Sequence, residues 1–584
     1  MIESSVSRSA NSRAAAPALF GWGMALLLLL ALAIRTPLLT LASSSYRLTE
    51  AFNIEEVENV RLSTGMLHKG TLHPHAYEYP SLFYELSLVV EAPLRALGRD
   101  TWTNDLVGVR AISLVFGLWT VWLAGRIGLR LGGAWAGLTA AAIVACDRTL
   151  IEISALAKPN AAQVAFLLAG FLVLMSLAAR PNTKDAVRAA AWFALAAASK
   201  WLGGLGLVGL ALAPVLANPH ATGRGLARLG LALRESLRIP APPISILLPV
   251  LTFGALFVIC VPGMLLSPRE FGFGLAQTFI AQSLHQRPLP MWTPLAFLLQ
   301  SLGPVAALAA AIGLVWGIAR ALDWDGSPSS NGLVLVLGWA LAYGALVLFV
   351  FVKLPSYLDL WIPFLAVIAG CAIAGPTGLL RTSSGRAAAF AAVLAGGIVA
   401  NGAHGAASVA LVKHDTRVAA GEWLATRGAP GDSVLADLGV FVPDRFRNVN
   451  WNWWGSPPRV VYDETQTWGR DPLWPEWYGG HRRLVFENAK WSPAESLLAR
   501  QPRWVVTDER WEAVRAHPEA ASESAAPEFD RSLADGSAGY ALRARLVASP
   551  APRNEWRVLG LARGTDSPLV AGPAIRIWER ASGR

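Results

Sequence analysis

The sequence has few charged residues and few cysteines. Only 15% of its 584 residues are Asp, Glu, Lys or Arg, and there are three cysteines. Cys146, Cys260 and Cys371 all lie in apolar stretches, so neither a disulfide framework nor a thiolate metal site is predicted. The chain also lacks a Walker A loop, a dinucleotide-binding glycine motif, an HExxH motif and a serine nucleophile elbow. No nucleotide site is therefore expected.

The chain is largely apolar. Hydrophobic residues make up 54% of the chain, and they come in blocks of about 20 residues, the length a helix needs to cross a bilayer. The first block, 14–34, follows Arg8 and Arg13 but lacks a small-residue cleavage motif, which favours a transmembrane helix over a signal peptide. The net charge of +10 is typical of basic membrane-protein loops, and no nucleic acid partner is expected.

The apolar blocks predict about eleven membrane spans. We expect them near 14–34, 107–125, 132–146, 160–179, 188–199, 201–217, 244–262, 294–318, 332–352, 355–375 and 387–411. One long helix over 188–217 is the alternative to a break at Lys200. Acids are scarce within these spans, which argues against a proton-coupled transporter.

The charges of the loops predict the orientation of the chain. With the N-terminus inside, the inner loops hold most of the basic residues: Arg126, Arg130, Arg180, Lys184, Arg188, Arg224, Arg228, Arg234, Arg238, Arg320, Arg381 and Arg386. The short outer loops hold Arg148, Lys158, Lys200, Arg269, Arg287 and Lys353. The positive-inside rule then predicts a cytoplasmic tail at 1–13 and a membrane domain at 14–411, with an outer loop at 35–106. The composition suggests a bacterial inner membrane.

The C-terminal region, 412–584, has a different pattern. Long apolar blocks stop, and short strand-like runs such as 433–436 and 504–507 alternate with helix-like runs such as 417–426. This alternation predicts a small extracytoplasmic α/β domain.

The outer loop between the first two spans carries the first candidate site. Glu55 and Glu56 lie in it, together with His75, Tyr77 and Tyr79. The acids are either a solvated helix start or, at the membrane interface, a general base whose partial burial raises its pKa. They are also suited to hold a metal with a neighbouring histidine.

Three lysines form the second candidate site. Lys158, Lys200 and Lys353 each stand in an apolar context at the predicted outer end of a span. Each alone is consistent with snorkelling to the interface. Together they indicate a positive patch at headgroup depth, suited to a phosphate, which Arg287 would extend.

An aromatic run between 451 and 478 is the third candidate. It contains Trp451, Trp453, Trp454, Tyr462, Trp468, Trp474, Trp477 and Tyr478. Such residues pack a core, form an interfacial belt or stack on sugars, and the sequence does not choose among these.

Four sequence elements resemble the GT-C glycosyltransferases of the dolichyl-phosphate-mannose–protein mannosyltransferase type, which include the aminoarabinose transferases of lipid A. They are Glu55-Glu56 with Met66-Leu67, Gly70 and Tyr79-Pro80; Ala157-Lys158-Pro159-Asn160; Ser199-Lys200-Trp201; and Lys353-Leu354-Pro355-Ser356-Tyr357 through Pro363. The resemblance covers about residues 14–411 and implies a GT-C-like α-helical polytopic fold. Two positions depart from it, since Glu55 and Asn160 stand where the family has Asp, and Asn cannot ionise.

The resemblance implies transfer of a sugar from a polyprenyl-phosphate donor to a protein, lipid or glycan acceptor. Glu55 would be the general base, and Glu56 would orient the acceptor or a metal. Lys158, Lys200, Lys353, Tyr357 and Arg287 would bind the donor phosphate. The acceptor or sugar would contact Tyr79, His75 and Asn160. No cofactor is certain, and a divalent metal stays open.

Two rival functions remain. A lipid or solute transporter would show broken helices at the bilayer midplane and an internal repeat, neither of which is clear in the sequence. A non-catalytic membrane protein that binds glycan is compatible with the departures at Glu55 and Asn160.

Overall fold

The computed structural model describes residues 3–44, 54–74, 77, 79–218, 224–238, 243–284, 292–349, 355–375, 377–402, 415–437, 440–443, 447–448, 501–509, 526–547 and 574–581. The chain divides into two compact units. We call Met1–Leu39 with Asn59–Ala406 the helical unit, and Thr40–Glu58 with Ala407–Arg584 the sheet unit. Each is described by itself.

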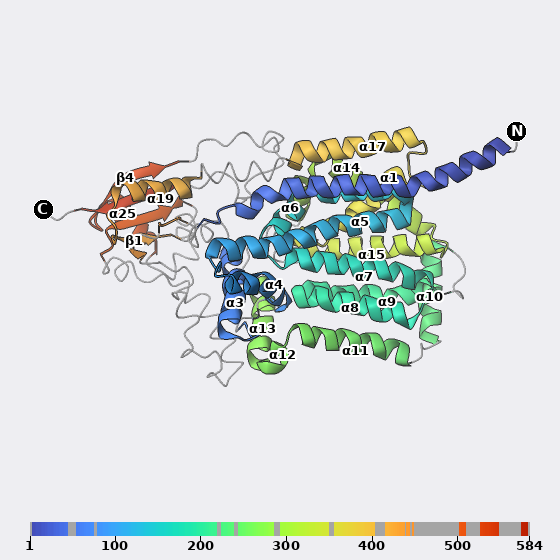
Figure 1. Cartoon of the computed structure of the whole chain (residues 1–584), viewed down its shortest axis with the longest axis horizontal. Helices are drawn as coiled ribbons and strands as arrows, with labels where there is room; N and C mark the ends of the chain where they lie inside the picture. The colour runs from blue at the N-terminus through green and yellow to red at the C-terminus, as the bar shows by residue number, and fades with distance from the viewer. Residues whose placement is uncertain are drawn as a thin grey trace. The chain divides into compact units, whose positions relative to one another are not determined.

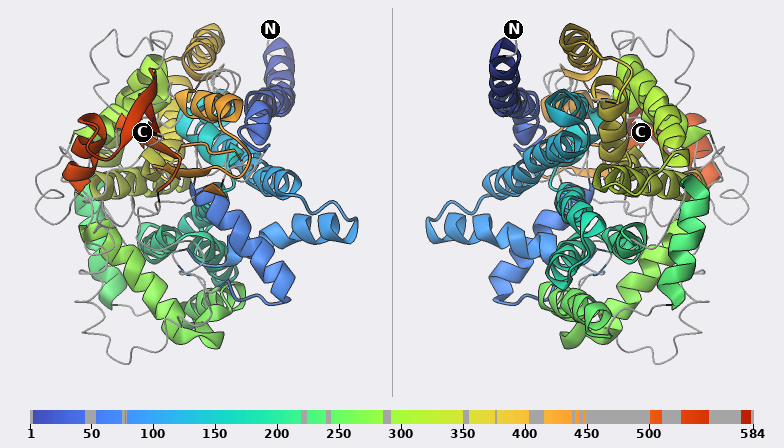
Figure 2. Two further views of the ribbon diagram at one scale, coloured as in Figure 1. Left: turned by 90° about the vertical axis from the view of Figure 1, so that its left-hand side faces the viewer. Right: turned by 90° about the vertical axis from the view of Figure 1, so that its right-hand side faces the viewer.

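The helical elements form a bundle whose long members run side by side (Figures 1 and 2). They are α1 (Glu3–Arg35), η1 (Thr36–Thr40), α3 (Ile54–Lys69), α4 (Leu82–Ala96), α5 (Trp102–Cys146), α6 (Arg148–Ala155), α7 (Asn160–Ala179), α8 (Thr183–Ser199), η2 (Trp201–Leu205), α9 (Gly206–Leu216), α10 (Gly225–Arg238), α11 (Pro243–Cys260), α12 (Gly263–Leu266), α13 (Pro268–Leu284), α14 (Thr293–Leu322), α15 (Pro328–Phe349), η3 (Pro355–Leu358), α16 (Ile362–Ala374), α17 (Ser383–Gly397) and η4 (Ile398–Gly402).

Six helices in the described part of the chain are long and apolar enough to cross a membrane, and three shorter helices are also apolar. The predicted α-helical polytopic membrane fold is therefore confirmed, while the number of eleven spans stays a prediction. The structure differs from the predicted span 355–375. Helix α16 begins only at Ile362, and the residues before it form η3 and a turn.

α5 contains two of the predicted spans. Its backbone leaves the helical conformation at Gly133, where φ is 79°. The two halves then pack against each other through small residues: a Cβ on Gly137 would lie 2.6 Å from the carbonyl oxygen of Gly125. Small residues let helix backbones approach closely in membranes, so the glycines explain how α5 folds back on itself.

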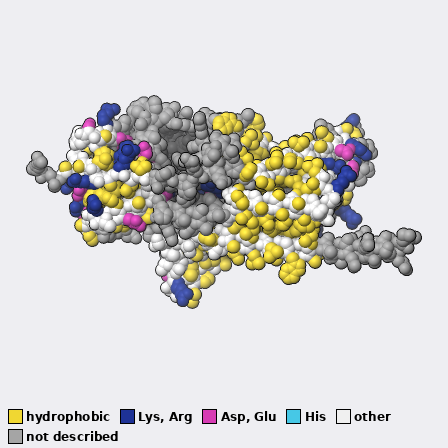
Figure 3. Space-filling view, turned by 90° about the horizontal axis from the view of Figure 1, so that it is seen from above, with side chains coloured by type: hydrophobic (Ala, Val, Ile, Leu, Met, Phe, Trp, Pro, Cys, Tyr) yellow, Lys and Arg dark blue, Asp and Glu magenta, His cyan; other side chains and the backbone are white. Residues whose placement is uncertain are grey.

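The bundle exposes apolar side chains where a soluble protein would not. Trp22, Leu26, Val115, Ile259 and Val315 are all more than 60% exposed. On the face seen in Figure 3, hydrophobic side chains cover the bundle, and Lys and Arg gather at one end of it. Apolar surface of this extent needs a lipid or protein cover, which agrees with membrane insertion.

The sheet unit holds a five-stranded mixed sheet in the order β2-β1-β3-β5-β4. Its elements are α19 (Thr416–Arg427), β1 (Ser433–Ala436), β2 (Arg447–Asn448), β3 (Trp504–Asp508), α25 (Ala526–Ala534), β4 (Tyr540–Leu546) and β5 (Ile575–Arg580). β1 pairs in parallel with β2 and β3, and β5 runs antiparallel to β3 and β4.

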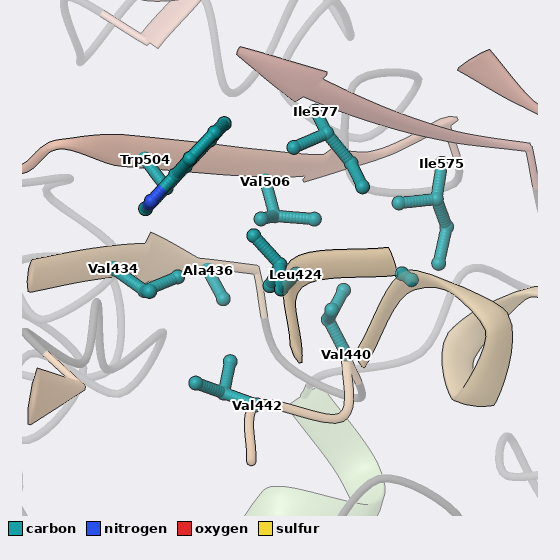
Figure 4. Close-up of a cluster of buried hydrophobic side chains, with 10 residues drawn as sticks. Leu424, Val434, Ala436, Val440, Val442, Trp504, Val506, Ile575 and Ile577 are labelled. Atoms are coloured by element: carbon teal, nitrogen blue, oxygen red, sulfur yellow. The ribbon is translucent and has the colours of Figure 1, made fainter. Parts of the chain in front are cut away.

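The core of this unit lies between α19 and one face of the sheet (Figure 4). Leu424 from α19 packs with Val434, Val506, Ile575 and Ile577 from three strands. The core residues of each strand lie two positions apart, as residues on one face of a strand do, while β3 is buried along its whole length. The predicted mixture of helices and strands in the C-terminal region is confirmed, while the domain bounds 412–584 stay a prediction, and β1 spans the four residues that the sequence indicated.

Candidate functional site

Lys200 lies at the centre of a polar cluster in the helical unit. Its backbone is extended between α8 and η2 (φ −157°, ψ 136°), which confirms the predicted break in this segment. The side chain is only 7% exposed. Its Nζ donates to Asn160 Oδ1 at 3.2 Å and lies 5.0 Å from the ring centre of Tyr79 and 5.8 Å from that of Tyr357. Both distances are in the range of cation–π contacts.

Asn160 links this ammonium to a carboxylate. The Asn160 amide nitrogen donates to Asp359 Oδ2 at 2.6 Å, and the backbone N–H of Leu360 donates to Asp359 Oδ1 at 2.7 Å. Asn160 is 1% exposed and Asp359 2%. The glycosyltransferase family that the sequence resembles has an Asp where this chain has Asn160. In this chain the carboxylate of Asp359, from a distant segment, contacts the Asn160 amide.

Three further hydrogen bonds hold the cluster in place. On α7, Gln163 Nε2 donates to the carbonyl of Lys200 at 3.0 Å. On α15, Tyr343 donates to the carbonyl of Tyr357 at 3.0 Å, and Trp339 donates to that of Leu360 at 3.3 Å. Buried side chains therefore satisfy the irregular backbone on both sides of the ammonium, as buried peptide groups require.

Tyr79 follows a segment that is fixed by a second polar cluster. His73 Nδ1 is 2.6 Å from the Tyr77 hydroxyl, while its Nε2 is 2.7 Å from Ser267 Oγ and 3.1 Å from Glu270 Oε2. Ser267 and Glu270 lie just before and at the start of α13. These contacts tie His73 to the start of α13.

Aromatic packing extends this connection to Lys200. Phe271 on α13 contacts Tyr77 with ring centres 5.8 Å apart and Trp201 with ring centres 5.5 Å apart. A Cβ on Gly263 would overlap the Tyr77 hydroxyl, so a glycine is needed there. Burial, with Glu270 nearby, raises the pKa of Tyr77 well above its usual range, and the hydroxyl stays protonated.

Helix α4 contains two carboxyl groups that titrate near neutrality. Burial raises the pKa of Glu85 to about 7 and that of Glu91 to about 7. Ser81 donates to Glu85 at 2.9 Å and Ser63 donates to Glu91 at 2.7 Å, which lowers each pKa in part. The loss of hydration dominates in both.

Four of the predicted site residues come together in the structure: Tyr79, Asn160, Lys200 and Tyr357. Lys158 lies two residues before Asn160, in the turn between α6 and α7, and is half-buried. Glu55 and Glu56 occupy the first turn of α3 and belong to the sheet unit, and Glu56 is buried. Their catalytic role stays a prediction.

Several predicted residues lie outside the described part of the chain. These are His75, Arg287, Lys353 and the aromatic run 451–478. Among the described residues, no group of three His, Cys, Asp or Glu side chains is placed to hold a metal ion, so the residues present do not define a metal site.

Sequence reasoning missed Asp359. A signal was available, because Asp359 is an acid between Leu358 and Leu360 inside a predicted span, and such acids are functional by default. His73, Ser267 and Glu270 were also missed as a group, since 194 residues separate His73 from Ser267.

A family model described as dolichyl-phosphate-mannose-protein mannosyltransferase matches residues 96–235 of the chain. No curated protein matches the chain. A crystal structure of ArnT from Cupriavidus metallidurans in the apo state is 16% identical, with 70% of this chain and 72% of that chain covered and a TM-score of 0.45. The same protein bound to undecaprenyl phosphate is 14% identical, with 95% and 98% covered and a TM-score of 0.46.

An oligosaccharyltransferase from Archaeoglobus fulgidus tethered with an acceptor peptide is also similar. It is 12% identical, with 96% of this chain and 88% of that chain covered and a TM-score of 0.49. The family match confirms the resemblance to GT-C glycosyltransferases over the part of the chain that carries Lys158, Asn160 and Lys200.

Proposed function

We propose that this chain is a membrane glycosyltransferase that moves a sugar from a polyprenyl-phosphate donor to an acceptor on the extracytoplasmic side of an inner membrane. The observation that carries the proposal is the buried ammonium of Lys200, which contacts Tyr79, Asn160 and Tyr357. Polar and aromatic side chains gathered around a cation at the end of a helical bundle suit a lipid phosphate.

Electrostatics supports a phosphate at this place. Asn160 is the first residue of α7, and Asp359 and Leu360 lie just before Trp361, the N-terminal cap of α16. The N-terminal ends of helices attract anions, because the unpaired N–H groups and the helix dipole are positive there. Lys200 adds a full charge to the same location. In the transfer step this positive charge would stabilise the phosphate as the bond from the anomeric carbon to the phosphate oxygen breaks.

We assign the role of general base to Glu55, as the resemblance implies. An acceptor hydroxyl or amine would attack the anomeric carbon while Glu55 takes the acceptor proton and the lipid phosphate leaves with the bonding electrons. Glu55 lies one helical turn before Asn59 on α3. Asn59 in turn donates to the carbonyl of Ala157 at 2.8 Å, which anchors α3 beside the turn that carries Lys158. Glu56 would orient the acceptor.

The transfer assay tests the proposal. Purified protein in vesicles is incubated with radiolabelled polyprenyl-phosphate sugars and cell-envelope acceptors. We expect label to move to protein, lipid or glycan, and the labelled fraction identifies the acceptor class. Glu55→Gln should lower the rate by at least about 100-fold, the usual contribution of general base catalysis. Glu58→Gln makes the same charge change on the same helix and should retain activity.

Two results would contradict the proposal. If the parent protein moves lipid across the bilayer without transferring sugar, it is a transporter. If Glu55→Gln is folded and turns over normally, Glu55 is not the base.

The proposed orientation has its own test. Single cysteines near 200 should react with an impermeant reagent from outside, whereas cysteines near 185 and 230 should react only after permeabilisation. External labelling near 230 would reverse the topology.

A further inference from the structure

We infer that Asp359 is the positioning residue and counter-ion of Lys200, and that it acts through Asn160. This inference rests on the proposed function, because it concerns the ammonium that would bind the donor phosphate. It adds to the site a residue that the fourth sequence element spans but to which the resemblance assigns no role.

The direction of the hydrogen bonds carries the argument. An ionised carboxylate only accepts and an ammonium only donates, whereas a carboxamide does both. Asn160 lies between them, with its oxygen 3.2 Å from Lys200 Nζ and its nitrogen 2.6 Å from Asp359 Oδ2. The opposite orientation of the amide would face donor to donor and acceptor to acceptor. Asp359 therefore fixes the orientation in which Asn160 accepts from Lys200.

Burial makes this link necessary. Lys200, Asn160 and Asp359 are 7%, 1% and 2% exposed. A charge away from water is costly unless an opposite charge and hydrogen bonds compensate it. The N-terminal end of α7 adds positive potential next to Lys200. The carboxylate compensates both, so the ammonium stays charged and in place before a phosphate arrives.

The same count of hydrogen-bond donors and acceptors predicts that the amide at position 160 and the carboxylate at position 359 can be exchanged. In the double variant Asn160→Asp/Asp359→Asn, the carboxylate now at position 160 would accept from Lys200 and from the amide now at position 359. The oxygen of that amide would accept from the backbone N–H of Leu360, as Asp359 Oδ1 does in the parent. Every partner is then satisfied. Asp359→Asn alone leaves a donor facing a donor, and Asn160→Asp alone brings two carboxylates together.

The experiment is a titration of the full-length protein with undecaprenyl phosphate, with undecaprenol as the uncharged control lipid. The proteins are the parent, Asp359→Asn, Asn160→Asp, the double variant and Asp323→Asn, which removes a carboxylate whose side chain is 54% exposed. We expect each single change in the cluster to raise the Kd for undecaprenyl phosphate by about tenfold or more, as for loss of a hydrogen bond to a charged group. The double variant should recover to within about threefold. Undecaprenol binding should not change.

The pH profile separates positioning from mere stability. Tyr79, Asn160 and Tyr357 contact the Lys200 ammonium, and Asp359 contacts Asn160. Asp359→Asn removes the carboxylate that favours the charged form of Lys200. This variant should therefore lose undecaprenyl phosphate binding at a lower alkaline pH than the parent, and the double variant should restore the parent's pH profile. The melting temperature, measured alongside, should not track this shift.

Three outcomes would overturn the inference. Asp359→Asn binds like the parent, or the double variant fails to recover, or undecaprenol binding falls together with undecaprenyl phosphate binding. If Asp359→Asn does not fold, the double variant alone decides by its recovery or failure. A parent protein that binds both lipids alike would instead refute the proposed function itself.

Discussion

Arg35 and Lys200 are both buried cations of the helical unit, but they have different partners. Arg35, at the end of α1, is 0% exposed. It donates to the carbonyl of Ala145 at 2.8 Å, to that of Val144 at 3.4 Å and to Ser154 Oγ at 2.7 Å. Lys200 instead contacts side chains, namely Asn160, Tyr79 and Tyr357.

The helix ends explain the difference. Val144 and Ala145 are among the last residues of α5, where carbonyls lack helical partners and the dipole is negative, so Arg35 stabilises that end. Lys200 itself follows the C-terminal end of α8, but its ammonium contacts Asn160, the first residue of α7, where the dipole is positive. We interpret an ammonium held at this end of α7, with Asn160 and Asp359 to compensate it, as a site for an anionic ligand. Side-chain partners can also rearrange when a ligand binds, whereas main-chain carbonyls of a packed helix cannot.

The largest expected effect is on stability at Arg35. Arg35→Met should lower the free energy of unfolding by at least about 3 kcal/mol, because several buried acceptors lose their donor at once. The melting temperature of the detergent-solubilised protein measures this. Arg126→Met, at an exposed arginine on α5, is the control and should melt like the parent. An Arg35→Met protein as stable as the parent would remove the structural half of the comparison.

Lys200 should show the reverse behaviour. Lys200→Met should weaken undecaprenyl phosphate binding by about 1.5–3 kcal/mol, the range for a hydrogen bond to a charged group. It should lower the melting temperature less than Arg35→Met does, because Asn160 and the backbone N–H of Leu360 still donate to the Asp359 carboxylate. The effect should be larger at low salt. Lys184→Met, at an exposed lysine on α8, should bind like the parent. A Lys200→Met variant that is mainly destabilised would make the two cations equivalent.

A smaller effect is expected at Glu91, a buried acid without a cation among its described contacts. Burial raises the pKa of Glu91 from 4.5 to about 7. Between these values the folded protein keeps a proton that the unfolded chain releases, so stability falls as pH rises through this window. Glu91→Gln should therefore stabilise the protein by about 1–3 kcal/mol at pH 8 and leave it nearly unchanged well below pH 4.5, where the carboxyl is protonated in both states.

Melting curves of the two proteins across this pH range measure the effect. An equal difference at both ends would show that the carboxyl does not titrate in the folded state.

The sequence was most informative where one residue or a local pattern decides the structure. The start of α7 at Asn160, the break at Lys200 and strand β1 follow from apolar blocks and their boundaries. The gathering of Tyr79, Asn160, Lys200 and Tyr357 came from the family resemblance. Asp359 was detectable as an acid inside a predicted span, but its partner was not predictable, because 199 residues separate Asp359 from Asn160.

A structure of the protein with bound undecaprenyl phosphate tests the central claim most directly. We predict that the phosphate lies within hydrogen-bond distance of Lys200 Nζ, beside Tyr79 and Tyr357, with Asn160 still bonded to Asp359. Arg35 should keep its bonds to Val144 and Ala145. A phosphate held elsewhere, with Lys200 unchanged, would mean that this lysine is structural like Arg35, and the proposed donor site would be wrong.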